Sequence, residues 1–120
     1  MNTTDKTRAM LVAAMLALSG CASKEVKPHN WALDVQNAET REAHELLADH
    51  YEEVAKAMDA DANEERAMLA QYQAHPHRYG KRILDLKAHA EAMIMDFEKA
   101  ARESREMARY HRSFAAESAK

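Results

Sequence analysis

Histidine and methionine are the side chains of this sequence that could bind a metal ion. All seven histidines and five of the eight methionines follow Cys21. Imidazole nitrogens and thioether sulfurs together suit copper or another soft metal. Met107 and His111 are four residues apart and therefore share one face of a helix. If the chain folds back on itself near His77, His44 lies opposite them and completes a mixed nitrogen and sulfur site.

A second candidate metal site is the sequence His75-Pro76-His77. Two histidines that flank a proline can hold a divalent ion such as Cu or Zn between them. Both sites also have ordinary explanations. Met107 falls where a methionine would fill a helix interface, and residues 75–77 are typical of an exposed loop in which proline ends one helix. The sequence leaves these alternatives open.

Patterns of other metal sites and of catalytic sites are missing from the sequence. A carboxylate-bridged di-iron bundle uses Glu-x-x-His on facing helices, but none of the histidines from His44 onward has Glu or Asp three residues before it. The zinc-helix pattern His-Glu-x-x-His is also absent. So are a glycine-rich phosphate loop and a serine or cysteine in a nucleophile motif. We therefore expect no catalytic activity.

The single cysteine ends an N-terminal segment with three recognisable parts. Lys6 and Arg8 precede an apolar run of about ten residues, from Ala9 to Leu18, which is too short to span a hydrocarbon core about 30 Å thick. The run ends in Leu18-Ser19-Gly20-Cys21. A branched apolar residue followed by two small residues and a cysteine resembles the lipobox of bacterial lipoproteins.

This resemblance covers about the first fifth of the chain, and it implies a location. Residues 1–20 would be a signal peptide that is removed, and Cys21 would carry two or three acyl chains such as palmitate, which anchor a protein stably. In lipoproteins of Gram-negative bacteria, a residue other than Asp after the cysteine, here Ala22, favours the outer membrane. We therefore expect an outer-membrane lipoprotein that faces the periplasm. The alternatives are an ordinary secretory signal with a coincidental cysteine, and an N-terminal membrane helix.

The residues after Cys21 are rich in helix formers and poor in helix breakers. The whole chain has two glycines and two prolines, and 31% of its residues are charged. Because Ala, Glu, Arg, Met and Leu dominate, we expect an all-α fold. Residues 21–36 show no sustained helical period and are predicted to be a flexible tether. Its Trp31 and Leu33 either dock on the helices or lie among lipid headgroups.

A helical domain is predicted over residues 37–120. Two segments without Gly or Pro, about 38–74 with Asn37 as N-cap and about 81–116, flank a turn at 75–80. Two helices of nearly equal length joined by a short turn indicate an antiparallel hairpin. Because residues 59–63 include poor helix formers, the first helix could alternatively break there, which would give three helices.

Apolar residues in the second predicted helix alternate at spacings of three and four, as in a coiled coil. The predicted seam consists of Ile83, Leu86, Ala90, Met93, Phe97, Ala100, Ser104, Met107, His111 and Phe114. Ile94, Ala101, Ala108 and Ala115 widen this stripe on one side. Since a two-helix hairpin of this size buries little apolar surface, we expect two copies to associate into a four-helix bundle.

Charge and layout narrow the expected function. The net charge is −3, and no basic stripe indicates binding to nucleic acid. The body resembles small all-helical lipoproteins of Gram-negative envelopes that have no assigned activity. The leading expectation is a structural or protein-interaction role, with the lipid membrane, a second copy and another envelope protein as partners. The competing expectation is copper or zinc binding in the periplasm through His and Met.

Overall fold

The computed structural model describes residues 28–118, and these residues form helices joined by short connections. The elements are α1 (Trp31–Gln36), α2 (Arg41–Ala74), the 3-10 helices η1 (Pro76–Arg78) and η2 (Gly80–Arg82), and α3 (Ile83–Ser118). No strand occurs among the described residues, so the predicted all-α class is confirmed. The predicted signal peptide, Cys21 and the first part of the predicted tether lie outside these residues.

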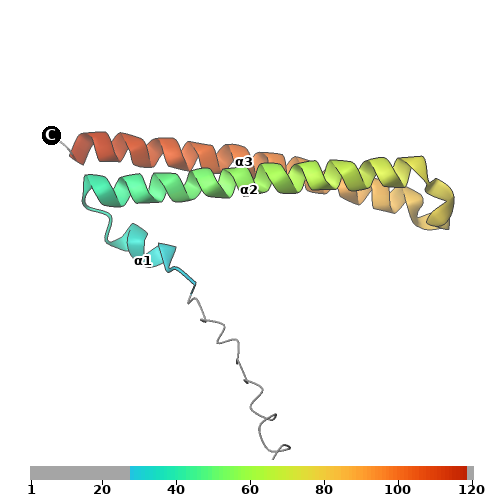
Figure 1. Ribbon diagram of the computed structural model, residues 1–120, viewed down its shortest axis with the longest axis horizontal. Helices are drawn as coiled ribbons and strands as arrows, with labels where there is room; N and C mark the ends of the chain where they lie inside the picture. The colour runs from blue at the N-terminus through green and yellow to red at the C-terminus, as the bar shows by residue number, and fades with distance from the viewer. Residues whose placement is uncertain (1–27, 119–120) are drawn as a thin grey trace, which may run out of the picture.

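The two long helices pack against each other and form the body of the molecule. α2 and α3 lie side by side and are connected at one end through η1 and η2 (Figure 1). Ion pairs between them show their relative direction. Glu52 lies opposite Arg112, Asp59 opposite Arg105, and Arg66 opposite Glu98, so the residue number rises along one helix as it falls along the other.

α2 is one continuous helix of 34 residues. It begins after Thr40, whose side-chain oxygen accepts a hydrogen bond from the Ala43 N–H at 3.2 Å and so caps the first turn. Asn37, which was predicted to be this cap, instead ends α1. The alternative break at 59–63 is also wrong. Asn63 accepts a hydrogen bond from the Arg66 side chain at 2.7 Å and therefore does not compete for the backbone of the helix.

Part of the predicted tether is helical. α1 covers residues 31–36, and Asn30 caps it by accepting a hydrogen bond from the Leu33 N–H at 3.2 Å. Trp31 stacks on His50 of α2, with the ring centroids 3.7 Å apart. This tertiary contact holds a helix that is too short to be stable by itself. Of the two places predicted for Trp31, the structure shows docking on the helical body.

Alanine forms most of the buried interface between α2 and α3. Two sets of buried alanines recur every seven residues: Ala48, Ala55 and Ala62 in α2, and Ala101, Ala108 and Ala115 in α3. By contrast, the predicted seam residues Met93, Met107 and Phe114 are 43%, 38% and 45% exposed. Of the predicted seam, Ala90 and His111 are buried, and the centre of the interface is rotated toward the alanines that were predicted to flank the seam. Small side chains let the two helix backbones approach closely, and the larger ones are displaced to the side.

Two edges of different character flank this alanine interface. The charged edge consists of Glu52, Asp59 and Arg66 from α2 with Glu98, Arg105 and Arg112 from α3. The apolar edge consists mainly of Val54 and Met68 from α2 with Met93, Met107 and Phe114 from α3, and Asp61 and Glu65 lie beside Met68 and Met93 on it. Residues of the apolar edge each precede an interface position such as Ala55 or Ala108, and this places them on the side opposite the ion pairs. Ion pairs thus connect the two helices along one side, whereas the other side exposes apolar side chains to solvent.

Candidate functional site

A continuous group of aromatic rings joins all three α-helices at the end of the molecule opposite the turn. This histidine cluster consists of His29, Trp31, His44, His50, Tyr51, His111 and Phe114. Successive ring centroids lie between 3.7 and 5.6 Å apart, running from His29 through Trp31, His50, Tyr51 and His111 to His44. Phe114 packs against both His44 and His111. Four of the seven histidines are therefore gathered in one place.

His44 and His111 make the central polar contact of the histidine cluster. Their Nδ1 atoms are 3.2 Å apart, so one imidazole donates a hydrogen bond and the other accepts it. His111 is only 7% exposed and lies parallel to the Tyr51 ring. Burial lowers the pKa of His111 from its usual 6.5, and the nearby His44 lowers it further. The arrangement thus favours the neutral form of His111, because a positive charge on this ring would be buried.

The outer part of the histidine cluster attaches α1 to α2. His29 donates a hydrogen bond from Nε2 to the Asp34 carboxylate, and its ring lies 4.1 Å from that of Trp31. Burial beneath this aromatic layer, followed by the electrostatic effect of nearby His29, lowers the pKa of His50 from 6.5. Both sites with a lowered histidine pKa therefore lie where one helix packs on another.

The structure brings together only part of the first predicted metal site. His44 and His111 are adjacent as predicted, but their Nδ1 atoms already hydrogen-bond to each other. Met107 lies one turn away from His111 on the apolar edge and is 38% exposed. Within residues 28–118, no group of three or more His, Cys, Asp or Glu side chains is placed to hold a metal ion. A site here would thus need the Met107 sulfur as its third ligand, and it stays a prediction.

The second predicted metal site lies at the turn. The rings of His75 and His77 are arranged edge to face with centroids 6.4 Å apart. His75 caps the end of α2 through its backbone N–H, and its Nδ1 is buried without a hydrogen-bond partner among the described residues. The turn supplies no third His, Cys, Asp or Glu ligand. This site also stays a prediction.

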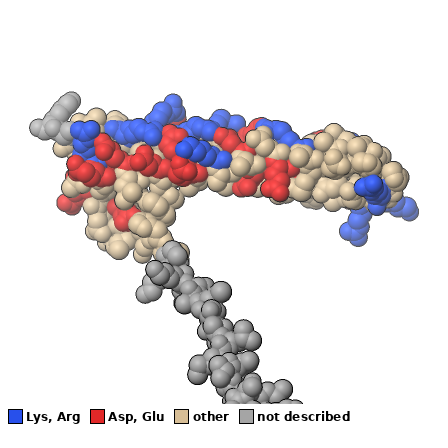
Figure 2. Space-filling view, viewed as in Figure 1, with Lys and Arg blue, Asp and Glu red and all other residues tan. Residues whose placement is uncertain are grey.

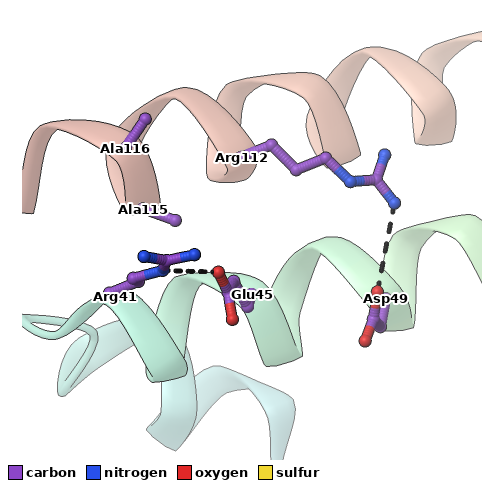
Figure 3. Close-up of a pocket in the computed structure, with 6 residues that line it drawn as sticks. All are labelled: Arg41, Glu45, Asp49, Arg112, Ala115 and Ala116. Atoms are coloured by element: carbon purple, nitrogen blue, oxygen red, sulfur yellow. Dashed lines mark hydrogen bonds and ion pairs between the residues drawn. The ribbon is translucent and has the colours of Figure 1, made fainter. Parts of the chain in front are cut away.

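Next to the histidine cluster, a shallow recess is lined by charged residues and two alanines. Figure 3 shows its lining residues, which are Arg41, Glu45, Asp49, Arg112, Ala115 and Ala116. The Arg41 Nε lies 2.7 Å from the Glu45 carboxylate, and Arg112 faces Asp49 at 3.9 Å. Since Arg41 pairs with Glu45 along α2 and Arg112 pairs with Asp49 from α3 to α2, every charged group that lines the recess already has a partner.

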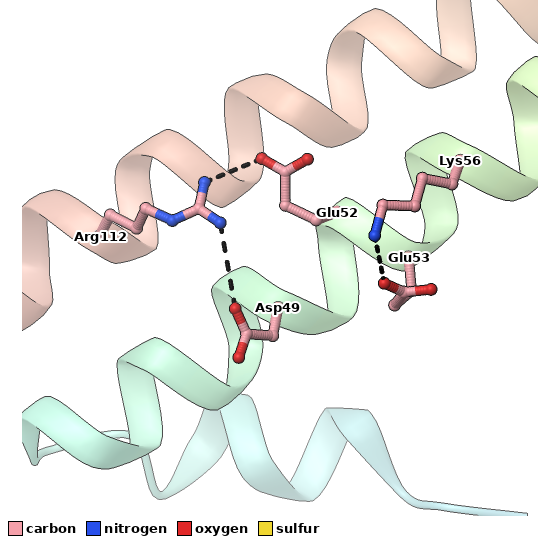
Figure 4. A network of polar contacts seen from close by, with 5 residues as sticks. All are labelled: Asp49, Glu52, Glu53, Lys56 and Arg112. Carbon is pink, nitrogen blue, oxygen red and sulfur yellow. Dashed lines mark hydrogen bonds and ion pairs between the residues drawn. The ribbon is translucent and has the colours of Figure 1, made fainter.

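Arg112 also links the recess to the charged edge. Its guanidinium donates to Glu52 at 2.8 Å while facing Asp49, and Glu53 and Lys56 form a separate pair nearby (Figure 4). The hydrogen bond from Arg112 lowers the pKa of Glu52. Sequence reasoning did not find this network, although the position of Arg112 directly after His111 in the heptad pattern is a signal that could have indicated it. No comparable signal marks the contact of Trp31 with His50.

Comparison of the chain with protein-family models, with curated proteins and with solved structures found no match. Among residues 28–118, no helix combines the length and the apolar character that a membrane span requires.

Proposed function

We propose that the protein is a bacterial envelope lipoprotein whose antiparallel helical hairpin has a structural or protein-interaction role and no catalytic activity. The observation that carries this proposal is the difference between the two edges. The charged edge pairs its own charges, whereas the apolar edge leaves Met68, Met93 and Met107 exposed to solvent. Exposed apolar groups aligned along one side of a rigid helix pair are typical of a surface that binds another protein.

Attachment to the outer membrane on its periplasmic side is supported by the sequence before the helices. Lys6 and Arg8, the apolar run that follows and Leu18-Ser19-Gly20-Cys21 have the order of a lipoprotein signal. The test is metabolic labelling with palmitate in a Gram-negative host. The unmodified chain is expected to be labelled and to sediment with outer membranes, and Cys21→Ala is expected to lose the label. A membrane-bound but unlabelled chain would instead favour the N-terminal membrane helix.

Self-association of the hairpin follows from how little it buries by itself. The interface between α2 and α3 consists mainly of alanines, which contribute little hydrophobic free energy because their side chains are small. Packing the apolar edges of two copies together would bury methionine and phenylalanine side chains and form a four-helix bundle. We therefore propose that the homodimer forms through the apolar edge.

The chain offers a matched pair of substitutions for testing the dimer. Met107 lies on the apolar edge, whereas Met95 points away from α2 and is 68% exposed. In the full chain carrying Cys21→Ala, Met107→Glu is expected to convert dimer to monomer in sedimentation velocity experiments in mild detergent. Met95→Glu is expected to leave the dimer intact. A folded monomer of the parent chain at micromolar concentration would disprove the proposal.

Copper or zinc binding is the alternative function, and the contact between His44 and His111 is the observation that favours it. Isothermal titration with Cu and Zn separates the two functions. If the alternative holds, a metal binds more tightly than tens of micromolar, and His111→Ala abolishes binding. His89→Ala serves as the control because His89 is exposed and outside the histidine cluster. The leading proposal predicts no such binding.

A further inference from the structure

The turn that joins α2 to α3 forms a basic tip at one end of the molecule. Arg78, Lys81 and Arg82 are all exposed, and none of them forms a salt bridge with another of the described residues. Figure 2 shows blue side chains and no red ones on an otherwise tan surface at the turn end of the molecule, whereas both charge signs mix over the rest of this face. We name Arg78, Lys81, Arg82 and the neighbouring Leu84 the basic tip.

Charge is segregated along the molecule as well as around it. Residues 69–90, which include the turn, contain four basic residues and one acidic residue, Asp85. Residues 38–68, at the other end of α2, contain ten acidic and three basic residues. Because unscreened attraction extends only about 10 Å at moderate salt, most of these carboxylates are too distant to neutralise the tip.

The backbone of the turn places these cations at the very end of the hairpin. Pro76 begins η1, and Gly80 has φ +54°, a conformation that other residues rarely adopt. Behind the turn, Tyr72 and Tyr79 pack edge to face with centroids 5.1 Å apart. The three cations thus lie on a turn whose conformation is supported by Pro76, Gly80 and the packing of the two tyrosines.

An exposed apolar side chain accompanies the cations. Leu84, two residues after Arg82, is 73% exposed, the highest value among the exposed large hydrophobic residues of the described chain. Cations next to an exposed leucine suit a bilayer surface, where basic groups contact anionic headgroups and the apolar group enters the boundary with the acyl chains. A soluble polyanion would attract the same cations but would leave Leu84 in water.

We propose that the basic tip binds the surface of a bilayer that contains anionic lipid. α1, which leads toward Cys21, lies at the opposite end of α2 (Figure 1). A helix of 34 residues is about 50 Å long. The hairpin would then touch lipid at two points separated by its length. This two-point placement rests on the proposed lipid anchor, whereas tip binding itself does not.

Vesicle co-sedimentation tests the proposal with the full chain carrying Cys21→Ala, so that no acyl chain contributes. The measured quantity is the ratio of affinity for phosphatidylcholine vesicles with and without phosphatidylglycerol. The ratio is compared between the tip variant and the parent chain, because both share the apolar run before Cys21 and the basic residues Lys6 and Arg8, whose contribution then cancels. Replacing all three cations, in Arg78→Gln/Lys81→Gln/Arg82→Gln, is expected to lower affinity for the anionic vesicles roughly 100-fold, about fivefold for each cation.

The matched control removes the same charge from the body of the hairpin. Lys56→Gln/Lys99→Gln/Arg102→Gln changes three exposed residues away from the tip and is expected to keep the preference for anionic vesicles. Leu84→Gln is expected to weaken binding severalfold. Far-UV circular dichroism verifies the helices of each variant. In the chain with an unmodified tip, raising the ionic strength is expected to abolish the preference for anionic vesicles. This measurement tests the electrostatic contribution to binding without any substitution.

Several results would overturn tip binding. These are a tip variant that keeps the full preference, a body variant that loses as much as the tip variant, or a preference that is unaffected by salt. If Leu84→Gln has no effect and soluble polyphosphate displaces the chain completely, the partner is a soluble polyanion and not a bilayer. Because Cys21→Ala is present throughout, none of these results depends on whether Cys21 is lipidated, which palmitate labelling decides separately.

Discussion

At the scale of single residues, His111 is notable because a titratable ring is buried between two helices. Its Nδ1 shares a hydrogen bond with the Nδ1 of His44, and Tyr51 and Phe114 cover its faces and edge. This contact requires that one ring offer an N–H and the other a lone pair. Protonation of His111 adds positive charge to a side chain that is only 7% exposed. The stability of this end of the molecule is therefore linked to pH.

The pH dependence has a defined sign. The pKa of His111 is lower in the folded chain than its usual 6.5, so the unfolded chain binds more protons as the pH falls. The stabilising contribution is complete above about pH 6.5 and is lost as the pH falls through the lowered pKa. We expect the urea unfolding midpoint to decrease between about pH 7.5 and about pH 5.5, and to decrease less in His111→Phe.

His89→Gln is the control for this prediction, because His89 is exposed on α3 and its replacement is expected to leave the pH dependence unchanged. Equal pH dependence in the parent chain and in His111→Phe would show that other groups carry it. His50, whose pKa is also lowered, would be the next residue to test.

Part of the histidine cluster was predictable from the sequence. The pairing of His44 with His111 follows from a turn near His77, because an antiparallel pair of helices fixes which residues face each other. The parts contributed by Trp31 and His50 were not predictable. Their contact depends on how α1 folds back on α2, and that path is set by a short connection with no strong turn signal.

At the scale of the helices, the alanine interface decides how α2 and α3 pack. Ala55 and Ala108 are completely buried, and larger residues stand beside them on the apolar edge. A leucine at position 55 would force the helices apart or push its side chain into a strained rotamer. Overpacking of this kind costs about 1–3 kcal/mol. We expect Ala55→Leu to lower the free energy of unfolding by that amount, as measured by urea denaturation.

Ala60 on the outer face of α2 supplies the control, since it is exposed and Leu has nearly the same helix propensity as Ala. Ala60→Leu is expected to leave stability almost unchanged. If Ala55→Leu instead raises stability, the helices have room between them that alanine does not fill.

The rotated seam shows why helices were easier to predict than their packing. Long stretches without Gly or Pro predicted two long helices, and α2 and α3 are those helices. A pattern of large apolar residues placed Met107 and Phe114 in the interface, because such residues gain most from burial. In the structure, close packing of the two backbones is favoured instead, and the small residues Ala108 and Ala115 occupy the interface. Likewise Thr40 and not Asn37 caps α2, since Asn37 closes α1.

At the scale of the whole molecule, the surface features separate by position. The charged edge joins α2 to α3 along one side, with exposed ion pairs that each contribute little stability. The apolar edge runs along the other side. The histidine cluster and the basic tip occupy opposite ends. This separation is consistent with the proposals above, in which a second copy binds along the side of the helix pair and a lipid surface contacts one end.

The proposed assembly through the apolar edge would make stability depend on concentration. Two associated chains dissociate when they unfold, so mass action raises the melting temperature as protein concentration rises. For a chain of this size we expect an increase of a few degrees for each tenfold increase in concentration.

Met107→Glu is expected to remove this dependence and lower the melting temperature, because a carboxylate cannot be buried in the dimer interface without a partner. Met95→Glu, away from the edge, is expected to retain it. A melting temperature of the parent chain that is independent of concentration would mean that the alanine interface and the charged edge suffice to hold one hairpin folded.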